Sequence, residues 1–257
     1  MKTGWVMGVF ALGLAGIGAA VAPKATAQSG AVRVIASNGV KGVLDEVRAQ
    51  CEHAIGRPLD IEFGTTAALK PQIEKGEAFD VVILTSEATD ALIKEGKLSA
   101  ASRANVSRVG IGVGIRKGAA KPDIWTADAL KATLLKAKSI TYAKEGASRP
   151  TIDKMIERLG IGDTLKSKTM MLDGADQTSA AVADGKTEVL LTLISEIVSA
   201  PGVEYVGPLP SEFQSYVGFA AGINTKSQNQ KASAALIQYL TGGQLASAFK
   251  AKGMETN

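Results

Sequence analysis

Residues 32–39 read Val-Arg-Val-Ile-Ala-Ser-Asn-Gly, and apolar residues at helical spacing begin directly after them. The run 32–36 has the short, β-branched composition of a buried strand. Segment 40–54 then places Val43, Val47 and Cys51 on one face and charged residues opposite, which predicts an amphipathic helix. A strand that passes directly into such a helix is the repeating unit of layered α/β folds.

The same alternation of strand and helix patterns continues along the chain. Further strands are predicted at 59–63, 81–84, 109–115, 139–142, 189–193 and 216–223. Further helices are predicted at 67–76, 86–96, 126–137, 149–159, 176–184 and 229–251, and glycines stand near their expected ends. The pattern predicts an α/β fold around a mostly parallel sheet.

Two of the predicted strand segments are long and similar to each other. Residues 109–115 read Val-Gly-Ile-Gly-Val-Gly-Ile, and residues 217–223 read Val-Gly-Phe-Ala-Ala-Gly-Ile. They indicate a chain that leaves one lobe, builds a second and returns. The lobes would be 28–110 plus 220–257, and 111–219. The alternative is a single sheet with two edge strands.

The N-terminal 27 residues have the pattern of a secretory signal peptide. Lys2 precedes an apolar run at 5–22, and Ala-Thr-Ala at 25–27 gives a small-residue cleavage site. A membrane anchor is the alternative, since the run only just reaches the length needed to span a bilayer. We expect cleavage before Gln28 and a soluble protein in the periplasm.

Composition excludes several classes of function. The formal charge of +4 over 257 residues falls to about +2 once Lys2 and Lys24 leave with the signal, which is too little for a nucleic-acid-binding protein. One cysteine and one histidine exclude an internal disulfide and a Cys/His zinc cluster. We therefore expect no metal, no cofactor and no nucleic-acid partner, and a monomer.

Polar residues follow two neighbouring predicted strands of the first lobe. Ser37 and Asn38 come after 32–36, and Thr65 and Thr66 come after 59–63. Ligands of open α/β sheets bind beyond the carboxyl ends of strands, where helix N-termini offer backbone N–H groups to anions. These residues are candidate contacts to one small anion, although each could simply cap its helix.

A third polar turn, residues 143–150, follows the predicted strand 139–142. Ser148 can cap the next helix, and Pro150 suits its first turn. Arg149 carries a fork of donors that matches a carboxylate, with a solvated surface charge as the alternative. Glu196 is a candidate for a hinge contact or a plain helix-start acid. No nucleophile elbow, phosphate loop or paired-histidine motif is present, so we expect binding and no catalytic residues.

Two stretches carry a resemblance to a known family. Phe-Gly-Thr-Thr-Ala-Ala-Leu-Lys-Pro-Gln-Ile-Glu-Lys-Gly-Glu-Ala-Phe-Asp-Val-Val-Ile at 63–83 and Ile-Ser-Glu-Ile at 194–197 are similar to periplasmic solute-binding proteins of the molybdate-binding-like group. The resemblance implies a two-lobed periplasmic binding protein fold (type II-like) with two strand crossovers. It also implies a small anionic ligand and, as partner, an ABC-transporter permease in the inner membrane.

Family motifs place the ligand contacts on specific residues of this chain. The first contact falls on Ser37 and the second on Thr66, with help from Thr65; the third is a backbone N–H near Ala147 or Ser148. Members that resemble true molybdate binders carry a tyrosine where this chain has Leu193. This departure leaves a small organic carboxylate as open as a molybdate-like oxyanion.

The same group includes periplasmic isomerases that move a double bond in aconitate. Such chemistry needs a general base, for which this chain offers Glu145, His53 or Glu196. A third interpretation is a sensor that reports its ligand state to a membrane receptor.

Overall fold

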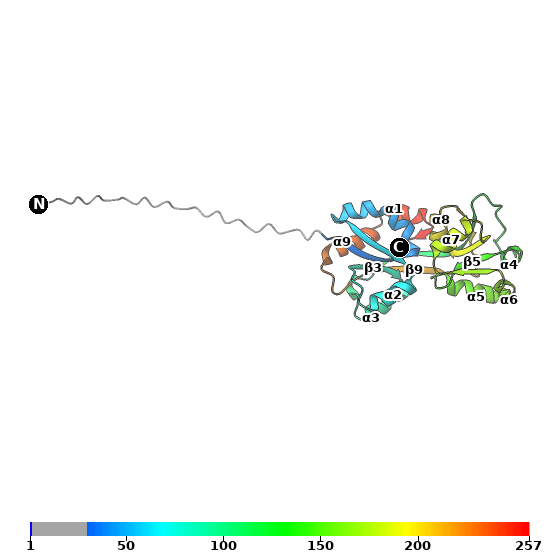
Figure 1. Ribbon diagram of the computed structural model, residues 1–257, viewed down its shortest axis with the longest axis horizontal. Helices are drawn as coiled ribbons and strands as arrows, with labels where there is room; N and C mark the ends of the chain where they lie inside the picture. Colours follow the sequence, from blue (N-terminus) through cyan, green and yellow to red (C-terminus); the bar gives the residue numbers. More distant parts are fainter. Residues whose placement is uncertain (2–29, 257) are drawn as a thin grey trace.

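The computed structural model describes Met1 and residues 30–256. Residues 30–256 form two lobes that lie side by side (Figure 1). Apart from Met1, the predicted signal peptide lies outside the described residues. Within the described part of the chain, no helix is both long and apolar enough to cross a membrane.

Both lobes are α/β layers built on one ten-stranded sheet, with the order β2-β1-β3-β9-β4-β7-β5-β6, and β8 and β10 also pair with β4. The first lobe contains β1 (Val32–Ser37), α1 (Asn38–Ile55), β2 (Leu59–Gly64), α2 (Thr66–Glu74), β3 (Val81–Thr85), α3 (Ser86–Lys94), η1 (Ala100–Ser102), β9 (Tyr216–Ile223), α9 (Gln230–Thr241), α10 (Ala246–Ala251) and β10 (Met254–Glu255). The second contains α4 (Ala127–Lys136), β5 (Ile140–Ala143), α5 (Arg149–Leu159), α6 (Gly162–Lys166), β6 (Thr169–Leu172), α7 (Ala175–Ala183), β7 (Val189–Leu193), α8 (Ile194–Ser199) and β8 (Val203–Pro208).

The long strand β4 (Ala104–Arg116) joins the lobes. Its first half pairs with β9, and its second half pairs with β7 and β8. β10 pairs with β4 at Val109, so the C-terminal strand also lies between the lobes (Figure 1). Gly112 must lack a side chain here, because a Cβ would lie 2.8 Å from the Tyr205 ring.

We propose that the first boundary between the lobes lies between Gly110 and Ile111, where β4 exchanges β9 for β7 as its partner. The sequence predicted the same boundary, with a first lobe of 28–110 plus 220–257 and a second lobe of 111–219. Since β9 pairs with β4 from Tyr216 onward, we propose that the chain re-enters the first lobe ahead of that residue.

The sheet is mixed, so the prediction of a mostly parallel sheet was wrong. β1 runs parallel to β2 and β3, and β5 runs parallel to β6 and β7. β4 and β9, in contrast, are antiparallel to every strand they pair with in the described structure. β4 carries the chain from the first lobe to the second, and β9 carries it back. The two strands therefore run in opposite directions.

The seven predicted strands are all present, and three further strands, β6, β8 and β10, were not predicted. β6 is partly exposed at the edge of the sheet and lacks a long apolar run. The helix predicted at 229–251 is two helices, because the chain turns at Gly242 and Gly243, where Gly243 has φ +87°.

Cys51 is buried among apolar side chains, and burial raises its pKa to about 11.

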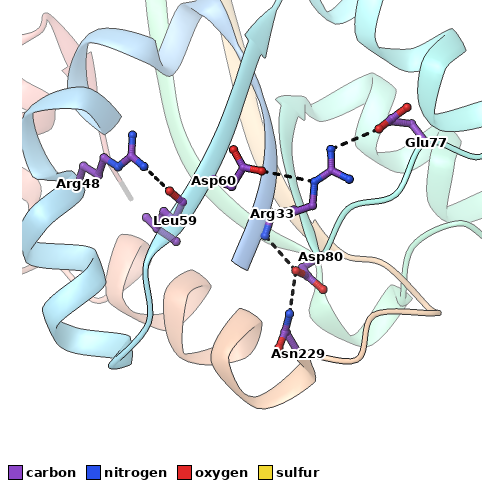
Figure 2. A network of polar contacts seen from close by, with 7 residues as sticks. All are labelled: Arg33, Arg48, Leu59, Asp60, Glu77, Asp80 and Asn229. Carbon is purple, nitrogen blue, oxygen red and sulfur yellow. Dashed lines mark hydrogen bonds and ion pairs between the residues drawn. The ribbon is translucent and has the colours of Figure 1, made fainter. Parts of the chain in front are cut away.

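The buried carboxylate of Asp80 accepts hydrogen bonds from several segments at the end of the first lobe where β1 and β3 begin (Figure 2). Asp80 Oδ2 accepts hydrogen bonds from the Arg33 backbone N–H (2.9 Å) and from Asn229 Nδ2 (3.0 Å). Its Oδ1 accepts a hydrogen bond from Ser227 Oγ at 2.5 Å. The residue thus joins two strands to the loop that precedes α9.

We expect Asp80→Ala to lower the free energy of unfolding by about 2–4 kcal/mol, because it leaves several donors without their acceptor. Asp60→Ala is the matched control: Asp60 pairs with the same Arg33 at 3.6 Å but is 66% exposed, so we expect less than about 0.5 kcal/mol. Urea unfolding measures both. Equal losses for the two variants would contradict the structural role of Asp80.

Candidate functional site

The carboxyl ends of β1 and β2 face those of β5 and β7 across the boundary between the lobes. A cavity of about 10 Å³ lies between them, with room for about one water molecule. Residues from both lobes line it: Ser37, Asn38, Thr65, Thr66, Ala143, Gly146, Ala147, Ala175, Leu193 and Glu196.

Ser37 is held in place as the last residue of β1 and the N-cap of α1. Its extended backbone (φ −64°, ψ 143°) ends the strand, and its Oγ accepts a hydrogen bond from the Gly39 N–H at 3.4 Å. The side chain is buried beside the first turn of α1, where backbone N–H groups favour negative charge. Among the described residues, the Ser37 hydroxyl donates to no acceptor, so its proton is available to a ligand.

The second strand-to-helix turn repeats this geometry. Thr65 is the N-cap of α2, and its Oγ1 accepts from the Ala68 N–H at 3.2 Å. Thr66 begins the helix, and its Oγ1 accepts from the Thr85 N–H at 3.4 Å. Two hydroxyl groups and the first turn of a second helix therefore face the same cavity as Ser37.

The turn after β5 lines the cavity with Gly146 and Ala147, which carry no polar side chain. Ala147 lines the cavity, whereas Ser148 is buried outside it and makes no side-chain cap to α5. Arg149 is used locally: its Nε contacts Asp153 at 2.6 Å, and its guanidinium lies over the Tyr142 ring at 5.2 Å.

Five of the seven residues predicted to bind ligand thus meet at one cavity, namely Ser37, Asn38, Thr65, Thr66 and Ala147. Ser148 and Arg149 do not line it. The pattern of polar residues after strands predicted Ser37, Asn38, Thr65 and Thr66, and the family resemblance predicted Ala147. Arg149 instead bonds Asp153, one turn along its own helix.

Glu196 is the ionisable residue in the cavity wall. It lies in the first turn of α8, directly after β7, and its Oε2 accepts a hydrogen bond from the Thr192 hydroxyl. Burial raises the pKa of Glu196 to about 7, although the bonds from Thr192 and the Leu193 N–H lower it, and nearby Asp176 adds to the rise. The carboxyl group can therefore gain or lose a proton near neutral pH.

The other two candidate bases lie away from this cavity. His53 is on the exposed face of α1, and Glu145 is exposed in the turn after β5. Neither lines the small cavity.

A second cavity, of about 420 Å³, continues from the first between α1, α7 and α8. The two share Asn38, Ala175 and Glu196, so Glu196 stands where they join. The charged residues of the second cavity are mostly acidic, and its cation, Lys41, is bonded to Asp45 at 2.8 Å.

A third cavity, of about 730 Å³, lies at the opposite end of the second lobe, beside the loop 117–123. It faces the start of β7 at Val189, whereas the polar strand ends converge where β7 stops at Leu193. Because ligands of α/β sheets bind at the carboxyl ends of strands, we place the candidate site at the smaller cavities.

The lobes are in direct contact beside the site. Ser195 Oγ of α8 donates to the Gly39 carbonyl of α1 at 2.7 Å. A Cβ on Gly42 would lie 2.0 Å from Ser199 Oγ, so the Ser199 side chain of α8 packs directly against the backbone of α1 at a glycine. The small cavity has room for about one water molecule, so a larger ligand fits there only if the residues around it move.

Known proteins resemble this chain over nearly all of its described length. The family model "Bacterial extracellular solute-binding protein" matches residues 32–255. An aconitate isomerase from Pseudomonas sp is 30% identical over 227 residues, covering 86% of each chain. The molybdate-binding protein ModA of Azotobacter vinelandii is 27% identical over 242 residues, covering 88% of this chain and 90% of the relative.

Solved structures share the fold at low sequence identity. The Azotobacter vinelandii periplasmic molybdate-binding protein superimposes with a TM-score of 0.75 at 16% identity, covering 88% of this chain and 99% of that one. The sulfate-binding protein SubI of Mycobacterium tuberculosis gives a TM-score of 0.70 at 14% identity, covering 87% and 86%. Together with the family match, these likenesses identify the chain as a member of the bacterial extracellular solute-binding protein family, with the two-lobed fold of the molybdate-binding group.

Proposed function

We propose that the protein captures a small anion between its lobes, in the periplasm, and delivers it to the permease of an ABC importer. The observation that carries this proposal is the convergence of two helix N-termini and the hydroxyls of Ser37, Thr65 and Thr66 on one cavity, opposite Ala147 of the second lobe. Neutral donors of this kind suit an anion that must later be released, because they bind it without a fixed countercharge.

The energetics favour contacts from both lobes. Micromolar affinity corresponds to about 8 kcal/mol, and each helix N-terminus contributes about 0.3–1 kcal/mol when exposed. Hydrogen bonds to a charged group contribute about 1.5–3 kcal/mol each. Three hydroxyls and two helix N-termini of the first lobe would together supply about 5–11 kcal/mol, and a contact from the second lobe would add to this sum. Ligand binding should accordingly stabilise the form in which the lobes are in contact.

Two ligand classes fit this site, a molybdate-like oxyanion and a small organic carboxylate. Leu193 offers no hydroxyl in the cavity wall, and the larger cavity beyond Glu196 leaves room for a ligand with a carbon skeleton. Ser148 and Arg149 do not line the cavity, and Arg149 would join the proposed site only if it left Asp153.

We expect Ser37→Ala to weaken anion binding about 10- to 100-fold, because it removes one hydrogen bond to a charged ligand. The best ligand comes first from a thermal-shift screen with molybdate, tungstate, sulfate and trans-aconitate, and titration calorimetry then gives the dissociation constants.

Thr126→Ala is the matched control for Ser37→Ala. Thr126 caps α4 by accepting from the Ala129 N–H at 3.1 Å, away from the cavity, so it loses a cap but no ligand contact. If no anion in the screen stabilises the wild-type protein, the result counts against anion capture. If Ser37→Ala binds the anion with the affinity of the wild type, Ser37 is not part of the site.

A second candidate function is isomerisation of an aconitate-type acid, which the 30% identical aconitate isomerase and the position of Glu196 favour. Moving a carbon–carbon double bond requires a base to take a proton from the carbon beside it and return the proton at the other end. Ionised Glu196 stands in the cavity wall with a pKa of about 7, which suits both halves of this transfer.

If the protein is an isomerase, trans-aconitate should convert to its isomer, and Glu196→Gln should lower kcat at least about 100-fold. The rate should rise with pH through about 7, because the base must be ionised. NMR of the substrate measures conversion, and exposed His53→Gln is the control that should keep full activity. Tight binding of trans-aconitate without conversion would exclude this activity and leave capture standing.

A further inference from the structure

The carboxyl group of Glu196 shares one cavity with the donors proposed to hold an anion. Ser37, Thr66 and Glu196 all line it, and Glu196 also faces the adjoining larger cavity. An ionised carboxylate at this place would put a second negative charge beside the ligand. At the separation of neighbouring groups in a cavity, with an effective dielectric constant of about 20, such repulsion would weaken binding on the order of 100-fold or more.

The elements around Glu196 provide no cation to offset that charge. On α1, Lys41 is bonded to Asp45. On α7, Asp176 is acidic and raises the pKa of Glu196, and Asp184 pairs with Lys186.

Other segments that pack against α8 are β4, β7 and β8, and the turn after α10, where Gly253 lies against Ile194 and Lys252 pairs with Glu46 at 3.0 Å. β7 contributes only the Thr192 hydroxyl and the Leu193 N–H. On β4, Arg116 lines the distant 730 Å³ cavity, and on β8, Glu204 pairs with Lys121 at 3.0 Å. Within residues 30–256, Glu196 therefore has hydrogen-bond donors but no ion-pair partner.

A proton on Glu196 would reverse this effect. Thr192 donates to Oε2, and no side chain of the described residues bonds Oε1. A protonated carboxyl group can then donate a hydrogen bond to a ligand oxygen and add to the donors of Ser37 and Thr66. The same residue repels an anion when ionised and binds it when protonated.

We infer that Glu196 couples anion capture to proton uptake: the anion binds to the form in which Glu196 is protonated and donates to a ligand oxygen. This inference rests on the proposed capture function and adds a residue that sets the affinity. Because the free carboxyl group has a pKa of about 7, binding should take up little proton at pH 6 and close to one proton above about pH 8.

The sign of the pH effect follows from this linkage. A ligand that prefers protonated Glu196 raises its pKa further, so affinity is constant below the pKa of the free protein. Above that pKa, affinity falls towards tenfold per pH unit until the pKa of the complex is reached.

The test is calorimetric titration with molybdate and with trans-aconitate from about pH 6 to 8.5, with the protons that each free ligand gains or loses in that range subtracted. Two buffers of different ionisation enthalpy at each pH give the number of protons taken up. For the wild-type protein we expect affinity to fall at least about 10-fold across this range, with proton uptake near one at the upper end.

Two variants separate Glu196 from other ionisable groups. Glu196→Gln keeps the shape and a donor but cannot titrate, so its affinity should be the same at both pH values, with no proton uptake. Asp176→Asn keeps Glu196 but removes the acid that raises its pKa, so uptake should persist and its onset should move to lower pH.

Three results would overturn the inference. The first is that the wild-type protein binds with equal affinity at pH 6 and 8.5 and takes up no proton. This result would contradict the role of Glu196 but leave the proposed anion capture intact. Proton uptake that persists in Glu196→Gln would assign the coupling to another group. Absence of binding at every pH, in the wild type and in Glu196→Gln alike, would instead refute the capture function itself and this inference with it.

Discussion

Gly39 is the point at which the two lobes and the proposed site depend on each other. Its N–H donates to the Ser37 side chain, and its carbonyl accepts from Ser195 of the second lobe. A Cβ at this position would lie 2.3 Å from the Phe219 ring and 2.8 Å from the Leu193 side chain. The first turn of α1 can therefore approach β7 and β9 only because residue 39 has no side chain, and this approach brings Ser37 to the boundary between the lobes.

The site follows from this packing and from the directions of the strands. β1 runs parallel to β2, and β5 runs parallel to β7, so the turns after them gather at two facing edges. The antiparallel strands β4 and β9 set those edges opposite each other across the sheet. Hydroxyls and helix N-termini of the first lobe then face Ala147 and Glu196 of the second. Donors for an anion and one titratable carboxyl group result from the same arrangement.

Much of this arrangement could be predicted from the sequence, because its causes are local. The apolar runs mark the strands, glycines such as Gly56 and Gly160 end helices in the left-handed region, and Ser37 and Thr65 follow strands as N-caps. Strand direction was not predictable in this way, since a buried run has the same pattern in either direction. Arg149 and Glu196 each bond a residue four positions away, Asp153 and Thr192, but a sequence pattern does not show which charged side chains the packing of the two lobes brings to the cavity.

The central claim is that an anion binds between the lobes at the ends of β1, β2 and β5. A crystal structure of the protein grown with the anion that stabilises it most would test this claim directly. The account predicts density for that anion within hydrogen-bond distance of Ser37 Oγ, Thr66 and the Ala147 N–H, with Glu196 beside it. Density for the anion elsewhere on the protein, with the small cavity holding only water, would contradict the account.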